Sequence, residues 1–156
     1  AQRAIKWVRK NASRFKLNEK KIGVMGFSAG GHLSANVSTY TKETYQQQDS
    51  IDGFSSRSNF SILIYPAYLD KGENGSLSPE ININELTPPF FVFGTNDDPY
   101  SNSAFVLSSA LKDNKIPVEL HMLANGGHGY GLREGNLAAE TWPPLVEKWL
   151  LRLLIQ

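Results

Sequence analysis

The stretch KIGVMGFSAGGHL, residues Lys21 to Leu33, places one serine among glycines where an apolar run ends and a helix-like run begins. Ile22 to Phe27 is too short for a helix and is bounded by glycine, so it predicts a buried strand. Residues 29–40 have a helical pattern. At the junction, Gly26-Phe27-Ser28-Ala29-Gly30 matches G-x-S-x-G, which favours a nucleophilic serine on a sharp, strained turn. We expect Gly26 and Gly30 to provide the clearance that this turn needs.

A plain strand-to-helix bend that contains serine is the alternative interpretation, and the rest of the chain decides between the two.

With 156 residues and 17.3 kDa, the chain predicts a single domain over residues 1–156. The formal charge is +1 and the basic residues are scattered, which argues against a nucleic-acid partner. No apolar run approaches the length of a membrane span, and no signal peptide is recognisable, so we expect no membrane partner.

The absence of cysteine excludes disulfides, thiolate metal sites and a cysteine nucleophile. This composition is compatible with the cytosol, and we expect a cytoplasmic protein.

Strand-like and helix-like segments alternate along the chain and predict a three-layer α/β/α sandwich with a mainly parallel sheet. Two of the strands, 22–27 and 90–93, are nearly all apolar, as is typical of strands covered on both faces. Trp142 and Trp149 belong to an apolar helical stripe that we expect to lie in the core. The predicted strands are 22–27, 60–65, 90–93 and 118–123, and the predicted helices are 2–15, 29–40, 101–114 and a last one entered through Pro143-Pro144.

Two connections between these segments are long. Residues 41–58 are polar and aperiodic, which indicates a surface excursion. Residues 69–88 form an irregular connection of the kind that often borders a binding site.

A serine hydroxyl is a weak nucleophile, so the hypothesis requires a histidine base and a carboxylate that orients it. Asp97 and Asp98 follow the third predicted strand, and His128 follows the fourth within a glycine-rich loop. The carboxyl ends of parallel strands share one edge of a sheet, so Ser28, Asp97 and His128 are expected to converge there. We favour Asp97 over Asp98 because it is the third residue after Gly94.

The other two histidines fit structural or surface roles better. His121 lies inside the fourth predicted strand, in the same parity as Glu119, and His32 lies on the helix that follows Ser28.

The runs GFSAGGHL, VFGTNDDPYSNS and VELHMLANGGHGYGL resemble segments of α/β-hydrolase carboxylesterases, especially those related to acetylxylan esterases and often labelled sugar hydrolases. The chain order of serine, aspartate and histidine also matches that fold. The resemblance implies hydrolysis of short acyl esters, such as acetyl groups on carbohydrate, through an acyl-enzyme. It implies Ser28 as nucleophile, His128 as general base and acid, Asp97 as orienting carboxylate and the Ala29 backbone amide as an oxyanion donor. No metal or cofactor is implied, and the partner is a small-molecule or sugar ester.

The family's chains begin with further strands and a glycine-rich loop that supplies a second oxyanion donor, and nothing like these precedes Ile22. We therefore expect this chain to be the C-terminal part of an α/β-hydrolase, in which the strand 22–27 presents an open apolar edge. Upstream sequence, or another subunit of a homo-oligomer, is expected to cover that edge.

Two alternatives remain open. A prolyl-oligopeptidase-type serine peptidase shares the triad and its order, and cleavage of peptide amides would favour it. A catalytically silent hydrolase-like binding domain is the other, and ligand binding without turnover would favour that one.

Overall fold

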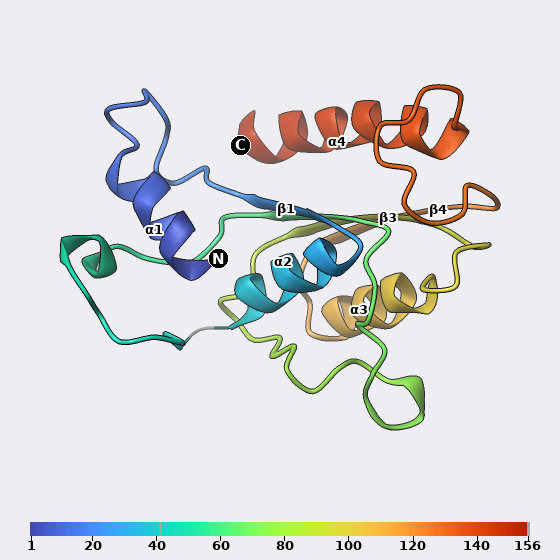
Figure 1. Ribbon diagram of the computed structural model, residues 1–156, viewed down its shortest axis with the longest axis horizontal. Coiled ribbons are helices and arrows are strands. Elements are labelled where there is room, and N and C mark those ends of the chain that lie inside the picture. The colour runs from blue at the N-terminus through green and yellow to red at the C-terminus, as the bar shows by residue number, and fades with distance from the viewer. Residues whose placement is uncertain (41, 156) are drawn as a thin grey trace.

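The computed structural model describes residues 1–40 and 42–155 (Figure 1). Thr41, the first residue of the predicted surface excursion, lies outside these ranges. The short 3₁₀ turns are η1 (Ser50–Gly53) and η2 (Glu73–Gly75). In chain order, the main elements are α1 (Gln2–Lys10), β1 (Val24–Phe27), α2 (Ala29–Thr39), β2 (Ser61–Ile64), β3 (Phe90–Thr95), α3 (Asn102–Asp113), β4 (Val118–Leu123) and α4 (Leu137–Ile155).

The four strands form one parallel sheet in the order β1-β2-β3-β4. Helices α2 and α3 cover one face of the sheet, and α4 covers the other (Figure 1). The prediction of a three-layer α/β/α arrangement with a parallel sheet is therefore confirmed. All four strands end at the same edge of the sheet, where the predicted site residues are expected.

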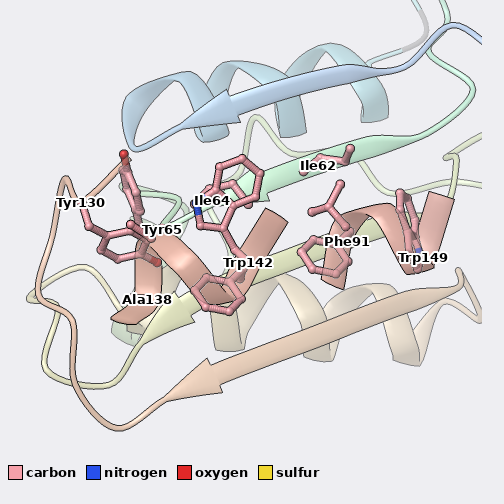
Figure 2. Close-up of a cluster of buried hydrophobic side chains, with 11 residues drawn as sticks. Ile62, Ile64, Tyr65, Phe91, Tyr130, Ala138, Trp142 and Trp149 are labelled. Atoms are coloured by element: carbon pink, nitrogen blue, oxygen red, sulfur yellow. The ribbon is translucent and has the colours of Figure 1, made fainter. Parts of the chain in front are cut away.

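The core has two halves, because alternate side chains of a strand point to opposite faces of the sheet. Ile62, Ile64, Phe91 and Phe93 pack against the inner side of α4, which contributes the two buried tryptophans Trp142 and Trp149. Figure 2 shows both tryptophans beside Ile62, Ile64 and Phe91. The expectation that both tryptophans belong to the core is confirmed. The other half, on the side of α2 and α3, contains Leu63, Phe90, Val92, Ala35, Ala104, Leu107 and Leu111.

The apolar sequence of the strand at residues 22–27 predicts that both of its faces are covered. This prediction is wrong, because β1 is an edge strand and is partly exposed. Met25 is 43% exposed and Phe27 is 37% exposed, whereas every residue of β2 is buried. The difference follows from position in the sheet: β2 lies between two strands, and β1 pairs with only one within the described residues. The expectation of an open apolar edge at β1 agrees with this arrangement.

Two helix boundaries differ from their predictions. Helix α1 ends at Lys10, because the Asn11 side chain donates to the carbonyl of Trp7 and competes with the helical hydrogen bonds. Helix α4 begins at Leu137 and contains both prolines, instead of starting at them. The Asn136 side chain accepts a hydrogen bond from the N–H of Ala139 at 3.1 Å, as an N-cap does.

No helix within residues 1–40 and 42–155 combines the length and the hydropathy needed to cross a membrane.

The segment after α2 is tied to α1 by charged groups and is more than a surface excursion. The buried Lys6 ammonium donates to the Asp52 carbonyl at 2.9 Å and pairs with Glu43, while Arg3 pairs with the buried Asp52 carboxylate at 2.7 Å. Hydrogen bonds from the Tyr45 hydroxyl, from backbone N–H groups and from Arg3 hold the pKa of Asp52 well below its usual range. Residues 43–52 are therefore anchored in spite of their polar sequence.

The turn between β1 and α2 depends on missing side chains at two positions. A Cβ atom on Gly26 would lie 1.9 Å from the carbonyl oxygen of Gly30, and one on Gly31 would lie 3.0 Å from Pro66. A Cβ on Gly30 would meet nothing within 4 Å. The predicted clearance at Gly26 is therefore confirmed, whereas the prediction for Gly30 is wrong, because Gly30 faces open space and Gly31 makes the close approach.

Gly26→Ala and Gly30→Ala form a matched pair that tests this geometry. Gly26→Ala should lower the free energy of unfolding by roughly 3 kcal/mol or more, because backbone atoms of α2 must move away from the new methyl group. Gly30→Ala should leave stability unchanged or raise it by up to about 1 kcal/mol, because alanine favours a helix and meets no clash. Chemical denaturation of both variants checks this, and equal losses would contradict the model of the turn.

Candidate active site

Ser28 lies at the tip of the turn between β1 and α2 in a strained backbone conformation, with φ of 54° and ψ of −120°. A positive φ is uncommon for a residue other than glycine and has a cost that the surrounding structure must offset. Here the Ser28 N–H donates to the Ile64 carbonyl at 3.1 Å, and the Ser28 carbonyl accepts from the Ala67 N–H at 3.2 Å. The end of β2 thus fixes Ser28 on the turn that the G-x-S-x-G pattern predicted.

His128 reaches Ser28 from the loop that follows β4. Its Nε2 atom lies 2.7 Å from the Ser28 hydroxyl oxygen, and its side chain is 25% exposed. Gly127 and Gly129 on either side have φ of +67° and +75°, a left-handed conformation that glycine adopts without steric cost. The structure therefore brings together two of the predicted site residues that are separated by 100 positions in the chain.

The carboxylate beside His128 is Asp98, and the prediction of Asp97 at this place is wrong. The Oδ2 atom of Asp98 lies 2.7 Å from His128 Nδ1, and the Asp98 side chain is only 2% exposed. The other oxygen, Oδ1, accepts a hydrogen bond from the Tyr100 N–H at 2.8 Å. Both oxygens of this buried carboxylate therefore have a hydrogen-bond partner.

The backbone turn after β3 explains why the second aspartate is the one that points inward. The Asp98 N–H donates to the carbonyl of Thr95 at 3.3 Å, which turns the chain back toward the sheet. Asp98 then accepts from the residue two positions later, an Asx turn that leads toward α3. Spacing from Gly94 does not reveal this reversal, whereas an aspartate with a turn-forming proline directly after it is a sequence signal that could have indicated Asp98.

Asp97 has a different contact with the same loop. Its carboxylate accepts hydrogen bonds from the N–H groups of Gly126 and Gly127, at 3.1 and 2.9 Å. The hydrogen bond from Gly127 and, to a smaller extent, the one from Gly126 lower the pKa of Asp97, because they favour the ionised form. Asp97 therefore fixes the backbone that leads into His128, and Asp98 contacts the imidazole itself.

The contacts of the imidazole define its tautomer. Because an ionised carboxylate only accepts hydrogen bonds, Nδ1 of His128 carries a proton and donates it to Asp98. In the neutral ring, Nε2 is then an acceptor, and the Ser28 hydroxyl donates to it. The arrangement can remove a proton from the serine hydroxyl and hold it on an imidazole that faces a carboxylate.

Ala29 is an exposed residue directly after Ser28, at the first position of α2. Within residues 1–40 and 42–155, its N–H has no backbone acceptor. An N–H at a helix N-terminus is well suited to a developing negative charge. Its predicted role as an oxyanion donor stays a prediction.

The side chains of the other two histidines contact glutamates instead of Ser28. His32 Nε2 is 2.8 Å from Glu80, and His121 Nε2 is 2.8 Å from Glu119, which also pairs with Arg152. This agrees with the structural roles expected for both. Throughout the part of the chain that the structure describes, no three acidic, histidine or cysteine side chains are grouped as a metal site.

Two tyrosines that the sequence did not single out contact His128. The centroid of the Tyr65 ring lies 5.0 Å from the centroid of the His128 ring, and the centroid of the Tyr100 ring lies 4.9 Å from it. Both directly follow or lie near the ends of strands, but aromatic residues at strand ends are common in cores, and no motif marks these two.

Comparisons with known proteins found one family model, two curated relatives and several solved structures that the chain is similar to. The BD-FAE family model matches residues 1–71. The chain is 30% identical to "Endo-1,4-beta-xylanase B" of Butyrivibrio fibrisolvens and to "Acetylxylan esterase" of Xylanibacter ruminicola, over 81% and 80% of its own length. It also matches the crystal structure of an acetyl ester-xyloside bifunctional hydrolase from Caldicellulosiruptor lactoaceticus, with a TM-score of 0.82, 30% identity and 97% of this chain covered.

These matches show the fold of the chain and the proteins that it resembles. The chain has the α/β-hydrolase fold. Within that fold it resembles esterases of the acetylxylan esterase kind. The chain spans 23% and 29% of the two curated relatives and 64% of the Caldicellulosiruptor structure.

The lowered pKa of Asp97 predicts how the hydrogen bonds between its carboxylate and the loop before His128 respond to acid. A carboxylate with a folded-state pKa below its unfolded value stabilises the fold above the unfolded value, near pH 4, and that contribution is lost as the pH falls through the folded value. Asp97→Ala should therefore reduce the unfolding free energy at about pH 6 and by progressively less below about pH 4. Denaturant unfolding of both proteins across this range checks it, and a pH-independent difference would contradict it.

Proposed function

We propose that the chain carries the active site of a serine carboxylesterase that hydrolyses short acyl esters. The observation that supports this most directly is the continuous relay from the Ser28 hydroxyl to His128 Nε2 and from His128 Nδ1 to Asp98, with both contacts at 2.7 Å. Three polar groups from separate loops meet at the carboxyl edge of the sheet, and one of them, Ser28, lies on a strained turn.

In the acylation step, the Ser28 oxygen attacks the ester carbonyl carbon and its proton passes to His128 Nε2. The imidazolium then gives this proton to the departing alcohol as the ester C–O bond breaks. In the deacylation step, a water molecule loses a proton to the same nitrogen and attacks the acyl carbon, and Ser28 recovers its proton when the acid leaves. Asp98 keeps Nδ1 protonated and stabilises the imidazolium in both steps.

The Ala29 N–H is the donor that this chain offers to the oxyanion. It is the amide directly after the nucleophile, the position that supplies one oxyanion donor in this fold. Loss of one such donor typically costs on the order of a hundredfold in turnover, so its alignment with the carbonyl oxygen is a substantial part of the proposed catalysis.

Acetyl groups on carbohydrate are the substrate class that we propose. The acetylxylan esterase of Xylanibacter ruminicola and the acetyl ester-xyloside hydrolase of Caldicellulosiruptor lactoaceticus, both 30% identical, support an acetyl ester on a sugar. The xylanase name of another relative does not lead us to propose glycoside hydrolysis at this site. Glycosidic cleavage normally uses a pair of carboxyl groups across the bond, whereas Ser28 and His128 form a nucleophile and its base.

The test compares Ser28→Ala, Asp98→Asn and Asp97→Asn in the full-length protein, with p-nitrophenyl acetate and acetylated xylan as substrates. Ser28→Ala should abolish turnover and labelling by a fluorophosphonate probe. Asp98→Asn should lower kcat by about 10³- to 10⁴-fold, because the amide favours the wrong imidazole tautomer. Asp97→Asn should cost about tenfold or less, since it weakens the loop without touching the ring.

Three results would contradict the proposal. Wild-type protein that neither turns over an ester nor reacts with the probe would indicate a hydrolase-like binding domain. A larger loss in Asp97→Asn than in Asp98→Asn would show that the carboxylate assignment is wrong. Faster cleavage of peptide amides than of acetyl esters would favour a serine peptidase.

A further inference from the structure

The His128 ring has an aromatic neighbour on each of two sides. Tyr65, the residue directly after β2, contacts it with ring planes at 67°, and Tyr100, which lies between β3 and α3, contacts it at 64°. Both are edge-to-face arrangements, which are the favourable geometry for aromatic pairs. We call Tyr65 and Tyr100 the tyrosine pair.

Tyr65 has an unusual backbone for its sequence context. Its φ is +39°, and it directly precedes Pro66, a position where the helical regions of the backbone map are disfavoured. The residue is 6% exposed, and its N–H donates to the Phe93 carbonyl. Strain of this kind persists only where neighbouring contacts enforce it, and it is concentrated at functional sites.

The side chain of Tyr65 joins two parts of the histidine loop. Its ring contacts His128, and its hydroxyl oxygen accepts a hydrogen bond from the Gly131 N–H at 3.1 Å. Tyr130 lies between His128 and Gly131 in the sequence, and the centroid of its ring is 4.4 Å from that of Tyr65. Figure 2 shows the two tyrosines together at the end of the core nearest the carboxyl ends of the strands. One buried side chain thus holds both the ring and the backbone that carries it.

Tyr100 contacts both Asp98 and His128. Its N–H donates to Asp98 Oδ1 at 2.8 Å, while its ring contacts His128. The ring is half-buried and is supported on a further side by Tyr68, with centroids 5.1 Å apart. Residue 100 therefore contacts both the carboxylate and the imidazole.

We propose that the tyrosine pair positions the His128 imidazole, and that its effect is greatest while Ser28 carries an acyl group. In the free protein the ring is held by two hydrogen bonds, to Ser28 and to Asp98. Acylation removes the Ser28 hydroxyl as a donor, so the Asp98 bond alone is left to hold the ring by hydrogen bonding. The two aromatic contacts do not depend on Ser28 and keep Nε2 facing the place where water must be activated.

This inference rests on the proposed esterase function for its kinetic consequence but not for its structural one. Tyr65→Phe keeps the ring but removes the hydroxyl that accepts from the Gly131 N–H, so it loosens the backbone of the loop that carries His128. Tyr100→Leu removes the aromatic contact with His128 itself, at a half-buried site. Tyr130→Phe is the matched control, because among the described residues the Tyr130 hydroxyl has no hydrogen-bond partner, so that its loss breaks no hydrogen bond.

The first readout is the ¹H NMR resonance of the His128 Nδ1 proton, assigned by its absence from His128→Gln. In Tyr65→Phe and Tyr100→Leu, we expect exchange of this proton with water to become roughly fivefold faster or more, because the ring leaves Asp98 more often. Tyr130→Phe should match the wild type. Unchanged exchange in both test variants would overturn the proposal, whatever the activity of the protein.

The second readout is the pre-steady-state burst with p-nitrophenyl acetate. In both test variants kcat should fall roughly tenfold with the burst rate changed by less than about threefold, because deacylation slows more than acylation. Equal loss in both phases would overturn the claim that the pair acts mainly on the acyl-enzyme. Faster proton exchange in the two test variants, combined with no ester turnover by the wild-type protein, would refute the esterase proposal and leave the positioning role intact.

Discussion

The strained backbone of Ser28 is the constraint on which the rest of the site depends. A conformation at positive φ costs on the order of 1–3 kcal/mol, and here it is enforced from several directions. The Ser28 carbonyl accepts hydrogen bonds from the N–H groups of Gly31, His32 and Ala67, while the Ser28 N–H is bound to the end of β2. The parallel pairing of β1 with β2 therefore sets both the position of the hydroxyl and the start of α2.

Two adjacent aspartates divide the task of holding the histidine. Asp97 is exposed and binds backbone N–H groups, whereas Asp98 is buried and binds the imidazole. A loop rich in glycine gains the left-handed conformations that it needs but loses more conformational entropy when it becomes ordered. The two carboxylates and the tyrosine pair supply the contacts that offset this loss, so that a flexible sequence presents a fixed ring.

Much of the fold and of the site could be predicted because periodicity and motif context are local properties. The strand-to-helix turn at Ser28, the parallel sheet and the approach of His128 all follow from the order of apolar runs and glycines. Spacing alone could not decide between Asp97 and Asp98, because the choice depends on a backbone reversal at Thr95 that only the proline after Asp98 marks in the sequence. The exposure of β1 and the role of Gly31 depend on neighbours distant in sequence, Pro66 among them, and local patterns carry no information about those.

The separation of 100 positions between Ser28 and His128 has a consequence for the order of events during folding. Every strand pair in this sheet is parallel and non-local, a topology that forms slowly because long loops must close before contacts compensate for them. Ser28 leaves the ribosome well before β4 and the loop that carries His128. Until that last segment docks, the hydroxyl is an ordinary alcohol in a nascent chain, and the reactivity that we propose for it is acquired only when the sheet is complete through β4.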